Sequence, residues 1–197
     1  PGLAEGGFLT SDDVLELRET PESMIVLGAG PVAVELAQFF CRIGTQTTLV
    51  QRSDYILSKG DEDLACPVET RFREEGMEVY TGTKLLRVEK SRHGSTVFFS
   101  HEGKEKSANA STILQALGRK PNIDGLNLSA ASVNVNQGRI EVDQEMRTNV
   151  PHIFAVGDVN GLHEIVHIAI EQGEIAAHNA TQEEARQFDE RLKLSIT

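Results

Sequence analysis

The feature that most constrains this chain is the stretch of residues 24–50, in which an apolar run, a glycine-containing turn, a helix pattern and a second apolar run follow in order. Residues 24–28, Met-Ile-Val-Leu-Gly, are typical of a central parallel strand covered on both faces. From Val32, apolar residues recur at spacings of three and four, and Gly44 follows them as a glycine does at a helix end. Residues 47–50 favour a second strand. This order predicts a dinucleotide-binding unit.

The turn between the first strand and the helix, Gly-Ala-Gly-Pro-Val-Ala, has small residues where a bound pyrophosphate requires them. Gly28 permits the tight turn out of the strand, and Gly30 lets the backbone approach a pyrophosphate because it has no Cβ. Ala33 takes the third position, where a small residue lets the helix and the strand pack closely. Pro31 and Val32 lie at the helix start, where free N–H groups and the helix dipole favour negative charge. The alternative is a glycine-rich turn in an unrelated α/β domain.

The end of the second strand distinguishes between the two nicotinamide dinucleotides. An NAD site usually presents Asp or Glu there to bind the ribose hydroxyls, but this chain has Gln51 followed by Arg52. Gln51 does not repel a 2′-phosphate, and the planar guanidinium of Arg52 could bind one. The sequence therefore predicts a preference for NADP(H) over NAD(H). The alternative for Arg52 is a solvated surface position.

The composition is that of an ordinary globular protein and argues against several functions. The chain has 197 residues, of which 39% are apolar and 25% are charged. Its net charge of −11 argues against a nucleic-acid surface, which requires a basic face. No apolar stretch approaches the roughly 20 residues that span a bilayer, and nothing at the start resembles a signal peptide, so we expect a cytoplasmic protein without a membrane partner. Cys41 and Cys66 lack the spacing of metal ligands, so we expect no metal site and two unreactive thiols.

The middle of the chain predicts a helix and then a series of short strands. A helix pattern opens at Asp61, and because Pro67 suits only a first turn, the helix is expected either to begin late or to kink there. Four short strand patterns separated by turn residues predict a β-meander. They lie at residues 77–80, 85–90, 96–100 and 104–108. A further strand is expected at 111–117.

The last third of the chain opens with a loop and closes with an amphipathic helix. Strand patterns are expected at residues 140–142 and 153–156, and the second is ended by Gly-Asp. An amphipathic helix is expected over about 163–181. Residues 192–197 have the pattern of the start of a strand.

Three long stretches carry a resemblance to a known family. They are TILQALGRKPNIDGL at residues 112–126, IEVDQEMRTNVPHIFAVGDVNG at 140–161 and IVHIAIEQGEIAAHNA at 165–180. Together they resemble the FAD-dependent pyridine nucleotide-disulfide oxidoreductases, the family of glutathione reductase, dihydrolipoamide dehydrogenase and mercuric reductase. In that family an NAD(P) domain is inserted into an FAD domain, and a dimerisation domain follows. The resemblance implies an α/β fold: a Rossmann-like three-layer NAD(P)-binding domain with a β-meander, plus a partial FAD-domain segment.

The resemblance also implies domain boundaries. Residues 1–20 match the linker from a missing FAD segment, 21–118 the NAD(P)-binding domain, 119–186 the returning FAD-domain segment and 187–197 the start of a truncated dimerisation domain. Because the chain begins with Pro1 and ends within an apparent strand, we expect it to be the middle of a longer protein. That full-length protein is expected to be a homodimer.

Individual residues of the first predicted domain receive roles from the resemblance. Glu35 matches a glutamate that pairs with a lysine beside the flavin, and that lysine is expected in the missing FAD segment. Pro31 stands where glutathione reductase has the tyrosine that gates the nicotinamide pocket. Arg52 matches a phosphate-binding arginine of NADP-using members, but their further arginine is here Ser58, followed by Lys59.

A second set of matches implies an FAD site. Gly118 and Arg119 match the turn between the domains, and we assign Gly118 to the nicotinamide nucleotide and Arg119 to FAD. Gly157 and Asp158 match a Gly-Asp pair whose carboxylate binds a ribitol hydroxyl of FAD. The next helix is expected to direct its N-terminus at the flavin pyrimidine edge. The FAD contacts expected from that helix are Ile165, Val166, His167 and Ala169. A surface pair with Glu171 is the alternative for His167.

Two functions from different classes stay open on the sequence. The first is the nucleotide-binding core of an FAD-dependent oxidoreductase, in which hydride passes from NAD(P)H to FAD and electrons pass to a small-molecule or protein disulfide-type acceptor. The redox disulfide and the catalytic His-Glu pair of that family are not in this chain, so we expect the chain alone to be inactive. The second is a stand-alone dinucleotide-binding or regulatory module without turnover.

Overall fold

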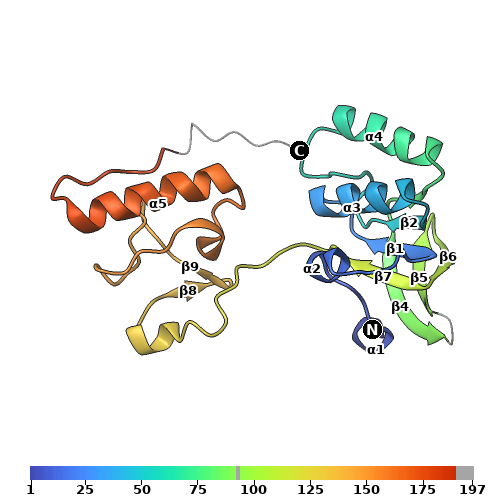
Figure 1. Ribbon diagram of the computed structural model, residues 1–197, viewed down its shortest axis with the longest axis horizontal. Helices are drawn as coiled ribbons and strands as arrows, with labels where there is room; N and C mark the ends of the chain where they lie inside the picture. The colour runs from blue at the N-terminus through green and yellow to red at the C-terminus, as the bar shows by residue number, and fades with distance from the viewer. Residues whose placement is uncertain (92–93, 190–197) are drawn as a thin grey trace. The chain divides into compact units, whose positions relative to one another are not determined.

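A computed structural model describes residues 1–91 and 94–189 (Figure 1). These residues divide into two compact units: the first comprises residues 1–118, and the second begins at Arg119. From residue 190 onward, the expected start of a dimerisation domain lies outside the described residues, as does the expected strand at 192–197.

A four-stranded sheet of order β3-β2-β1-β7 forms the centre of the first unit. Its strands are β1 (Ser23–Leu27), β2 (Gln46–Val50), β3 (Glu78–Tyr80) and β7 (Thr112–Gln115). All neighbouring pairs are parallel, with Met24 of β1 opposite Thr47 on one side and Thr112 on the other. Because the strands are parallel, their carboxyl ends meet at one edge of the sheet, where ligands of such folds bind.

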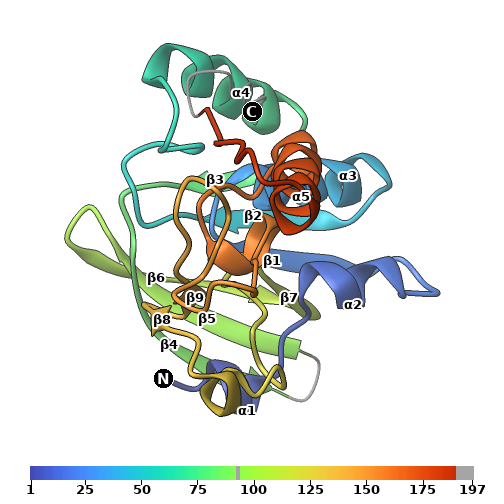
Figure 2. The same ribbon diagram turned by 90° about the vertical axis from the view of Figure 1, so that its left-hand side faces the viewer.

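Two cores cover the two faces of this sheet, because residues of β1 alternate between them. Met24 and Val26 pack with helices α3 (Pro31–Arg42) and α4 (Glu62–Glu74), whereas Ile25 and Leu27 pack on a second sheet. The second sheet consists of β4 (Lys84–Ser91), β5 (Gly94–His101) and β6 (Lys104–Ala110). Figures 1 and 2 show α3 and α4 on one side of the parallel sheet and the second sheet on the other. The predicted three-layer, Rossmann-like α/β arrangement is therefore confirmed.

The meander has three strands, β4, β5 and β6, and the prediction that the strand at 77–80 belongs to it is wrong. That segment forms β3, which pairs in parallel with β2, so that Thr48 lies opposite Glu78. Parallel pairing requires a long crossover, and α4 supplies it between β2 and β3. The buried Val79 then joins the core on the helix side of the sheet.

Helix α4 starts before its proline, so the expectation that the helix begins late, at Pro67, is wrong. The helix runs over Glu62–Glu74 with Pro67 inside it, where the ring removes one backbone hydrogen bond. Pro67 is exposed, while Ala65 and Phe72 are 1% and 2% exposed on the buried face. Core packing of that face therefore outweighs the lost hydrogen bond.

Residues 1–20, expected as a linker, belong to the first unit and pack on its sheets. They contain two short helices, α1 (Leu3–Gly6) and α2 (Ser11–Leu15). Between them, Leu9 forms a parallel bridge with Leu114, and its N–H donates to the Ile113 carbonyl at 2.8 Å. A capping box between Thr10 and Asp13 starts α2.

The second unit has less regular structure. Its elements are η1 (Leu128–Ala131), β8 (Val135–Asn136), β9 (Arg139–Ile140), η2 (Gly157–Asn160) and α5 (Val166–Thr181). The strand expected at 140–142 is the shorter β9, which starts one residue earlier. The strand expected at 153–156 is absent from the described structure, where Phe154 forms a single bridge with Arg147. An apolar run becomes a strand only where a neighbour satisfies its backbone groups along its length.

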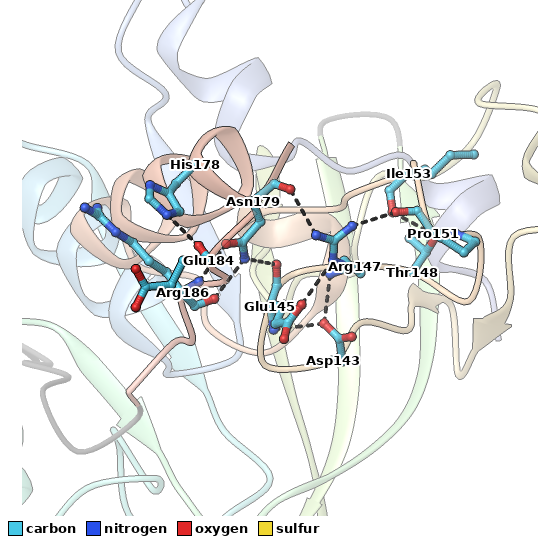
Figure 3. A network of polar contacts seen from close by, with 10 residues as sticks. All are labelled: Asp143, Glu145, Arg147, Thr148, Pro151, Ile153, His178, Asn179, Glu184 and Arg186. Atoms are coloured by element: carbon cyan, nitrogen blue, oxygen red, sulfur yellow. Dashed lines mark hydrogen bonds and ion pairs between the residues drawn. The ribbon is translucent and has the colours of Figure 1, made fainter. Parts of the chain in front are cut away.

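A polar network ties the C-terminal end of α5 to the loop before η2 (Figure 3). Arg147 donates to the carbonyl oxygens of Pro151 and Asn179, each at 2.9 Å. Asn179 in turn donates to the Glu145 carbonyl at 3.0 Å and accepts from the Arg186 N–H at 2.7 Å. Side chains thus connect segments that no long strand pairing holds together within this unit's described residues.

In the first unit, Glu75 joins α3 to the end of α4. Its carboxylate accepts hydrogen bonds from Arg42 at 2.7 Å, from Arg71 at 2.7 Å and from Gln38 at 3.1 Å, and the side chain is only 10% exposed. These donors, Arg42 first, lower the pKa of Glu75 to about 2.

Glu75→Gln is expected to make the protein less sensitive to acid. Since the folded pKa lies below the ordinary value of 4.5, the charged Glu75 stabilises the fold above that value, and this contribution is lost as the pH falls towards about 2. Urea unfolding across this pH window should show a smaller loss of unfolding free energy in E75Q than in the wild type. Glu74→Gln, at a side chain 60% exposed, is the matched control and should behave as the wild type does. The same acid-induced loss in E75Q would contradict this role.

Candidate functional site

The candidate site of the first unit lies at the carboxyl edge of the parallel sheet. Gly28, directly after β1, donates its N–H to the Val50 carbonyl of β2 at 2.9 Å. On the other side of β1, the Ala116 N–H donates to the Leu27 carbonyl at 2.9 Å. The chain segments that follow β1, β2 and β7 therefore meet at one edge of the sheet, where the turn into α3 begins.

The two glycines of the turn have different structural tasks. Gly28 has a φ of +105°, and a Cβ on it would collide with the carbonyl oxygen of Ala116. Gly30 has a φ of −76°, which any residue adopts, and a Cβ on it would meet nothing within 4 Å. Ala33 is 0% exposed and packs in the helix-side core. Gly28 and Ala33 thus build the turn, and Gly30 leaves open the surface above it.

The N-terminus of α3 at this turn carries uncompensated N–H groups. Gly30 is its N-cap and Pro31 its first residue, and it has neither a capping side chain nor an acidic residue in its first turn. The first intrahelical bond runs from the Val34 N–H to the Gly30 carbonyl at 3.0 Å, so the N–H groups of Val32 and Ala33 have no partner within the helix. An exposed helix end of this kind fits a phosphate group.

Gln51 and Arg52 follow β2 at the same edge of the sheet. The Gln51 backbone is fixed by its N–H bond to the Tyr80 carbonyl at 2.8 Å and by the Thr83 hydroxyl, which donates to the Gln51 carbonyl at 2.9 Å. The Gln51 side chain accepts from the Arg52 N–H at 3.1 Å. Arg52 is exposed, and its guanidinium forms no ion pair with any described residue. The neutral side chain of Gln51 beside the guanidinium of Arg52, unpaired among the described residues, suits an anionic group of a ligand.

A contact that the sequence does not signal ties the loop after β2 to the glycine turn. The Leu57 N–H donates to the Ala29 carbonyl at 2.7 Å, with Leu57 at a φ of +51°. Its neighbour Ile56 is 0% exposed and anchors the loop in the helix-side core. The exposed Lys59 and the half-buried Ser58 follow directly. Sequence periodicity does not predict this contact, because leucine is not one of the residue types that commonly adopt a positive φ.

Two further predicted residues of the first unit lie apart from these contacts. Glu35 is exposed on α3, one turn after the helix start, and no hydrogen bond or ion pair is found for its side chain in the part of the chain that the structure describes. Gly118 is exposed with a φ of +127°, and it ends the first unit.

In the second unit, the predicted Gly-Asp pair opens η2. Gly157 has a φ of +70°, and its N–H donates to the side chain of Gln172 at 2.7 Å. The Asp158 carboxylate lies 3.9 Å from the guanidinium of Arg119, which also lies 3.8 Å from Glu164. The side chains of Arg119 and Asp158 are 61% and 49% exposed, so this ion pair contributes little to stability and both groups can reach a ligand.

Helix α5 presents its N-terminus without a side-chain cap. Ile165 is the N-cap, and the first intrahelical bond runs from Ala169 to Ile165 at 3.0 Å, so the N–H groups of Val166 and His167 are free within the helix. A Cβ on Gly157 would lie 3.2 Å from that of Ala169, so the Gly-Asp turn packs on the helix. His167 is exposed, and among the described residues it has no hydrogen bond to Glu171.

The cysteines take no part in either site. Cys41 is half-buried, its thiol contacts the Glu75 carbonyl at 3.6 Å, and burial followed by the charge of Glu75 raises the pKa of that thiol. Cys66 is exposed within α4. Over residues 1–91 and 94–189, no group of three or more His, Cys, Asp or Glu side chains could hold a metal ion. No helix in the same ranges is long and apolar enough to cross a membrane.

A parallel sheet with a glycine turn leading into an uncapped helix at its carboxyl edge defines an α/β protein of the Rossmann type. The sequence profile of the family described as pyridine nucleotide-disulphide oxidoreductase matches residues 1–173. The chain belongs to this family, as the resemblance predicted.

Named relatives agree with this assignment. The chain is 37% identical over 174 residues to the dihydrolipoyl dehydrogenase of Bacillus subtilis, a match that covers 88% of this chain and 38% of that protein. It is 33% identical over 198 residues to a mercuric reductase of Staphylococcus aureus, which covers 100% of this chain and 36% of that protein. The chain thus spans less than half the length of these relatives.

Solved structures share the fold. The HOCl-induced flavoprotein disulfide reductase RclA from Escherichia coli superposes with a TM-score of 0.84 at 26% identity, covering 95% of this chain and 42% of that one. LpdA from Mycobacterium tuberculosis gives a TM-score of 0.81 at 27% identity, covering 92% and 39%.

The glycine turn predicts that two similar substitutions differ in their effect on stability. Gly28→Ala combines a positive φ with a collision against Ala116 and should lower the free energy of unfolding by about 1–3 kcal/mol. Gly30→Ala has ordinary φ and open space, and it should stay within about 0.5 kcal/mol of the wild type. Urea unfolding of both variants measures the difference, and equal stabilities would contradict the two tasks assigned to these glycines.

Proposed function

We propose that the first unit binds a nicotinamide dinucleotide, NADP(H) in preference to NAD(H), at the carboxyl edge of its parallel sheet. The observation that carries the proposal is the open surface at Gly30 above the uncapped N-terminus of α3. The site contains what a pyrophosphate needs: space without a Cβ, free N–H groups at Val32 and Ala33, and no carboxylate in the first turn. When bound, the dinucleotide would supply the hydride, and the protein would bind and orient the dinucleotide.

The preference for NADP(H) rests on the residues after β2. The guanidinium of Arg52 is exposed and forms no ion pair with the described residues, so it is available to a 2′-phosphate. Gln51 carries no charge, and its side-chain oxygen is already bonded to the Arg52 N–H, so it does not replace the carboxylate that binds ribose hydroxyls in NAD sites. The bond between Leu57 and Ala29 attaches the loop after β2 to the glycine turn, and the next two residues of that loop, Ser58 and Lys59, are proposed as further donors.

The second unit is proposed to contribute to an FAD site in the full-length protein. Asp158 offers a carboxylate to a ribitol hydroxyl, and its neighbour Arg119 lies 3.9 Å away. The free N–H groups at Val166 and His167 would stabilise negative charge on a group held at the start of α5. Ile165 and Ala169 flank that helix start. In the same unit, Nε2 of the buried Gln172 has no hydrogen-bond partner among the described residues. Glu35 on α3 is proposed for an ion pair beside the flavin.

For the full-length protein we propose a flavin-dependent oxidoreductase that passes electrons from NAD(P)H to a disulfide-type acceptor. Family membership and relatives named for dihydrolipoyl and mercuric substrates support this class of activity. The 197-residue chain contains Cys41 and Cys66 as its cysteines, one half-buried and one exposed on another helix, and we propose that it has no turnover alone. The full-length protein is proposed to be a homodimer.

Gly30→Ala tests the site itself. A methyl group at Gly30 occupies the surface proposed for the pyrophosphate, so it should weaken NADPH binding by about tenfold, or roughly 1.4 kcal/mol, in a chain that remains folded. Fluorescence titration of NADPH into the 197-residue chain measures this. Unchanged affinity in a folded G30A chain would place the dinucleotide elsewhere.

Arg52→Glu tests the preference between the cofactors. The charge reversal should weaken NADPH binding by about tenfold or more and leave NADH binding within about twofold, because only NADPH has the 2′-phosphate. Arg18→Glu makes the same change at another exposed arginine of the first unit and should leave both affinities unchanged. Equal affinity of the wild type for NADPH and NADH would contradict the preference.

A further inference from the structure

Helix α5 places polar residues on its buried face. Ile168, Gln172, Ile175 and Asn179 follow one another at spacings of four and three, and all four side chains are buried. Gln172 is 0% exposed. A buried amide is costly unless its polar atoms are bonded, so its partners indicate why a glutamine stands in the middle of an apolar stripe.

The carbonyl end of the Gln172 side chain joins the helix to both sides of the Gly-Asp turn. Its Oε1 accepts from the Gly157 N–H at 2.7 Å and from the Asn160 side chain at 2.9 Å. Asn160, which is 1% exposed, donates also to the Ala155 carbonyl at 3.2 Å and accepts from the Leu162 N–H at 3.0 Å. One buried oxygen thus fixes the residue before Asp158 and, through Asn160, the end of the same turn.

Within the described residues, the other hydrogen bonds of this turn are local: the Gly161 N–H donates to the Asp158 carbonyl at 3.0 Å, and Asn160 bonds to Ala155 and Leu162. Gly157 is at a φ of +70° and packs against Ala169, and η2 is a single short turn of four residues. The Asp158 side chain itself is 49% exposed, and its ion partner among the described residues is Arg119 at 3.9 Å. The direction of the Asp158 carboxylate therefore depends on the backbone beneath it, and the Gln172 oxygen holds that backbone to the helix.

Only the acceptor end of Gln172 is used. Its Nε2 is buried and has no hydrogen-bond partner in residues 1–91 and 94–189. A glutamate at this position would supply the same acceptor, and an apolar residue of the same length would not. Comparing a glutamate with an apolar residue of the same length therefore distinguishes the role of the side-chain oxygen from the role of the side-chain volume.

We propose that Gln172 is a positioning residue of the FAD site, whose side-chain oxygen holds the turn that carries Asp158. This inference rests on the proposed FAD function of the second unit. It predicts that removing the oxygen at constant side-chain length releases the Gly157 N–H and weakens FAD binding, and that a glutamate restores both.

The test compares Gln172→Met, Gln172→Glu and the surface control Gln182→Leu in the 197-residue chain. Hydrogen exchange of the Gly157 amide should be about tenfold faster in Q172M, as expected for the loss of one hydrogen bond, while the Ala169 amide within α5 is unchanged. Q172E and Q182L should exchange as the wild type does. Wild-type protection of Gly157 in a folded Q172M chain would overturn the proposal. If Q172M is unfolded by circular dichroism, Q172E decides at a pH at which it is folded: wild-type protection of Gly157 in folded Q172E supports the proposal, and lost protection in folded Q172E overturns it.

FAD fluorescence titration of the same substitutions made in the full-length protein, for which the FAD site is proposed, separates this inference from the proposed function. Q172M should bind FAD about tenfold more weakly than the wild type and Q172E within about twofold of it. Faster Gly157 exchange with unchanged FAD affinity would overturn the positioning role. If the wild-type full-length protein binds no FAD, the proposed FAD function fails, while faster Gly157 exchange in Q172M would still show that the Gln172 oxygen holds the turn.

Discussion

The close approach of three backbone segments at Gly28 is the constraint on which the first unit depends. Gly28 leaves β1, donates to the Val50 carbonyl of β2, and lies so close to the Ala116 carbonyl after β7 that a Cβ cannot fit. Three parallel strands therefore end together, and the chain must turn there into α3. The free N–H groups of that helix, the open surface at Gly30 and the cation at Arg52 are placed at one edge as a consequence.

In the second unit, hydrogen bonds from side chains hold the backbone segments together. Its strands β8 and β9 have two residues each, so backbone pairing fixes little of it. Arg147 and Asn179 instead connect the loop before η2 to the end of α5 (Figure 3), and Gln172 connects η2 to the middle of the helix. Buried polar groups of this kind specify one arrangement only when they are bonded, which makes the unit sensitive to single amide substitutions.

The sequence predicted the parts whose pattern is local. The apolar period of residues 24–50 sets β1, α3 and β2, and the Gly-Asp pair marks the start of η2. What it missed depends on distant partners. The strand at 77–80 joins the parallel sheet because α4 carries the chain back over it, and the run at 153–156 stays irregular because a single bridge pairs it within the described residues. No sequence motif marks the contact of Leu57 with Ala29 or the contacts of Gln172. A glutamine within the apolar stripe of α5 does, however, indicate a buried polar contact.

The central claim is that the turn between β1 and α3 binds the pyrophosphate of a nicotinamide dinucleotide. It is tested most directly by following the backbone amide resonances of the 197-residue chain as NADPH is added. The account predicts that the largest shifts fall on Gly30, Val32 and Ala33, with a second group at Gln51 and Arg52. Shifts confined to the second unit, or none at these five residues at saturating NADPH, would contradict it.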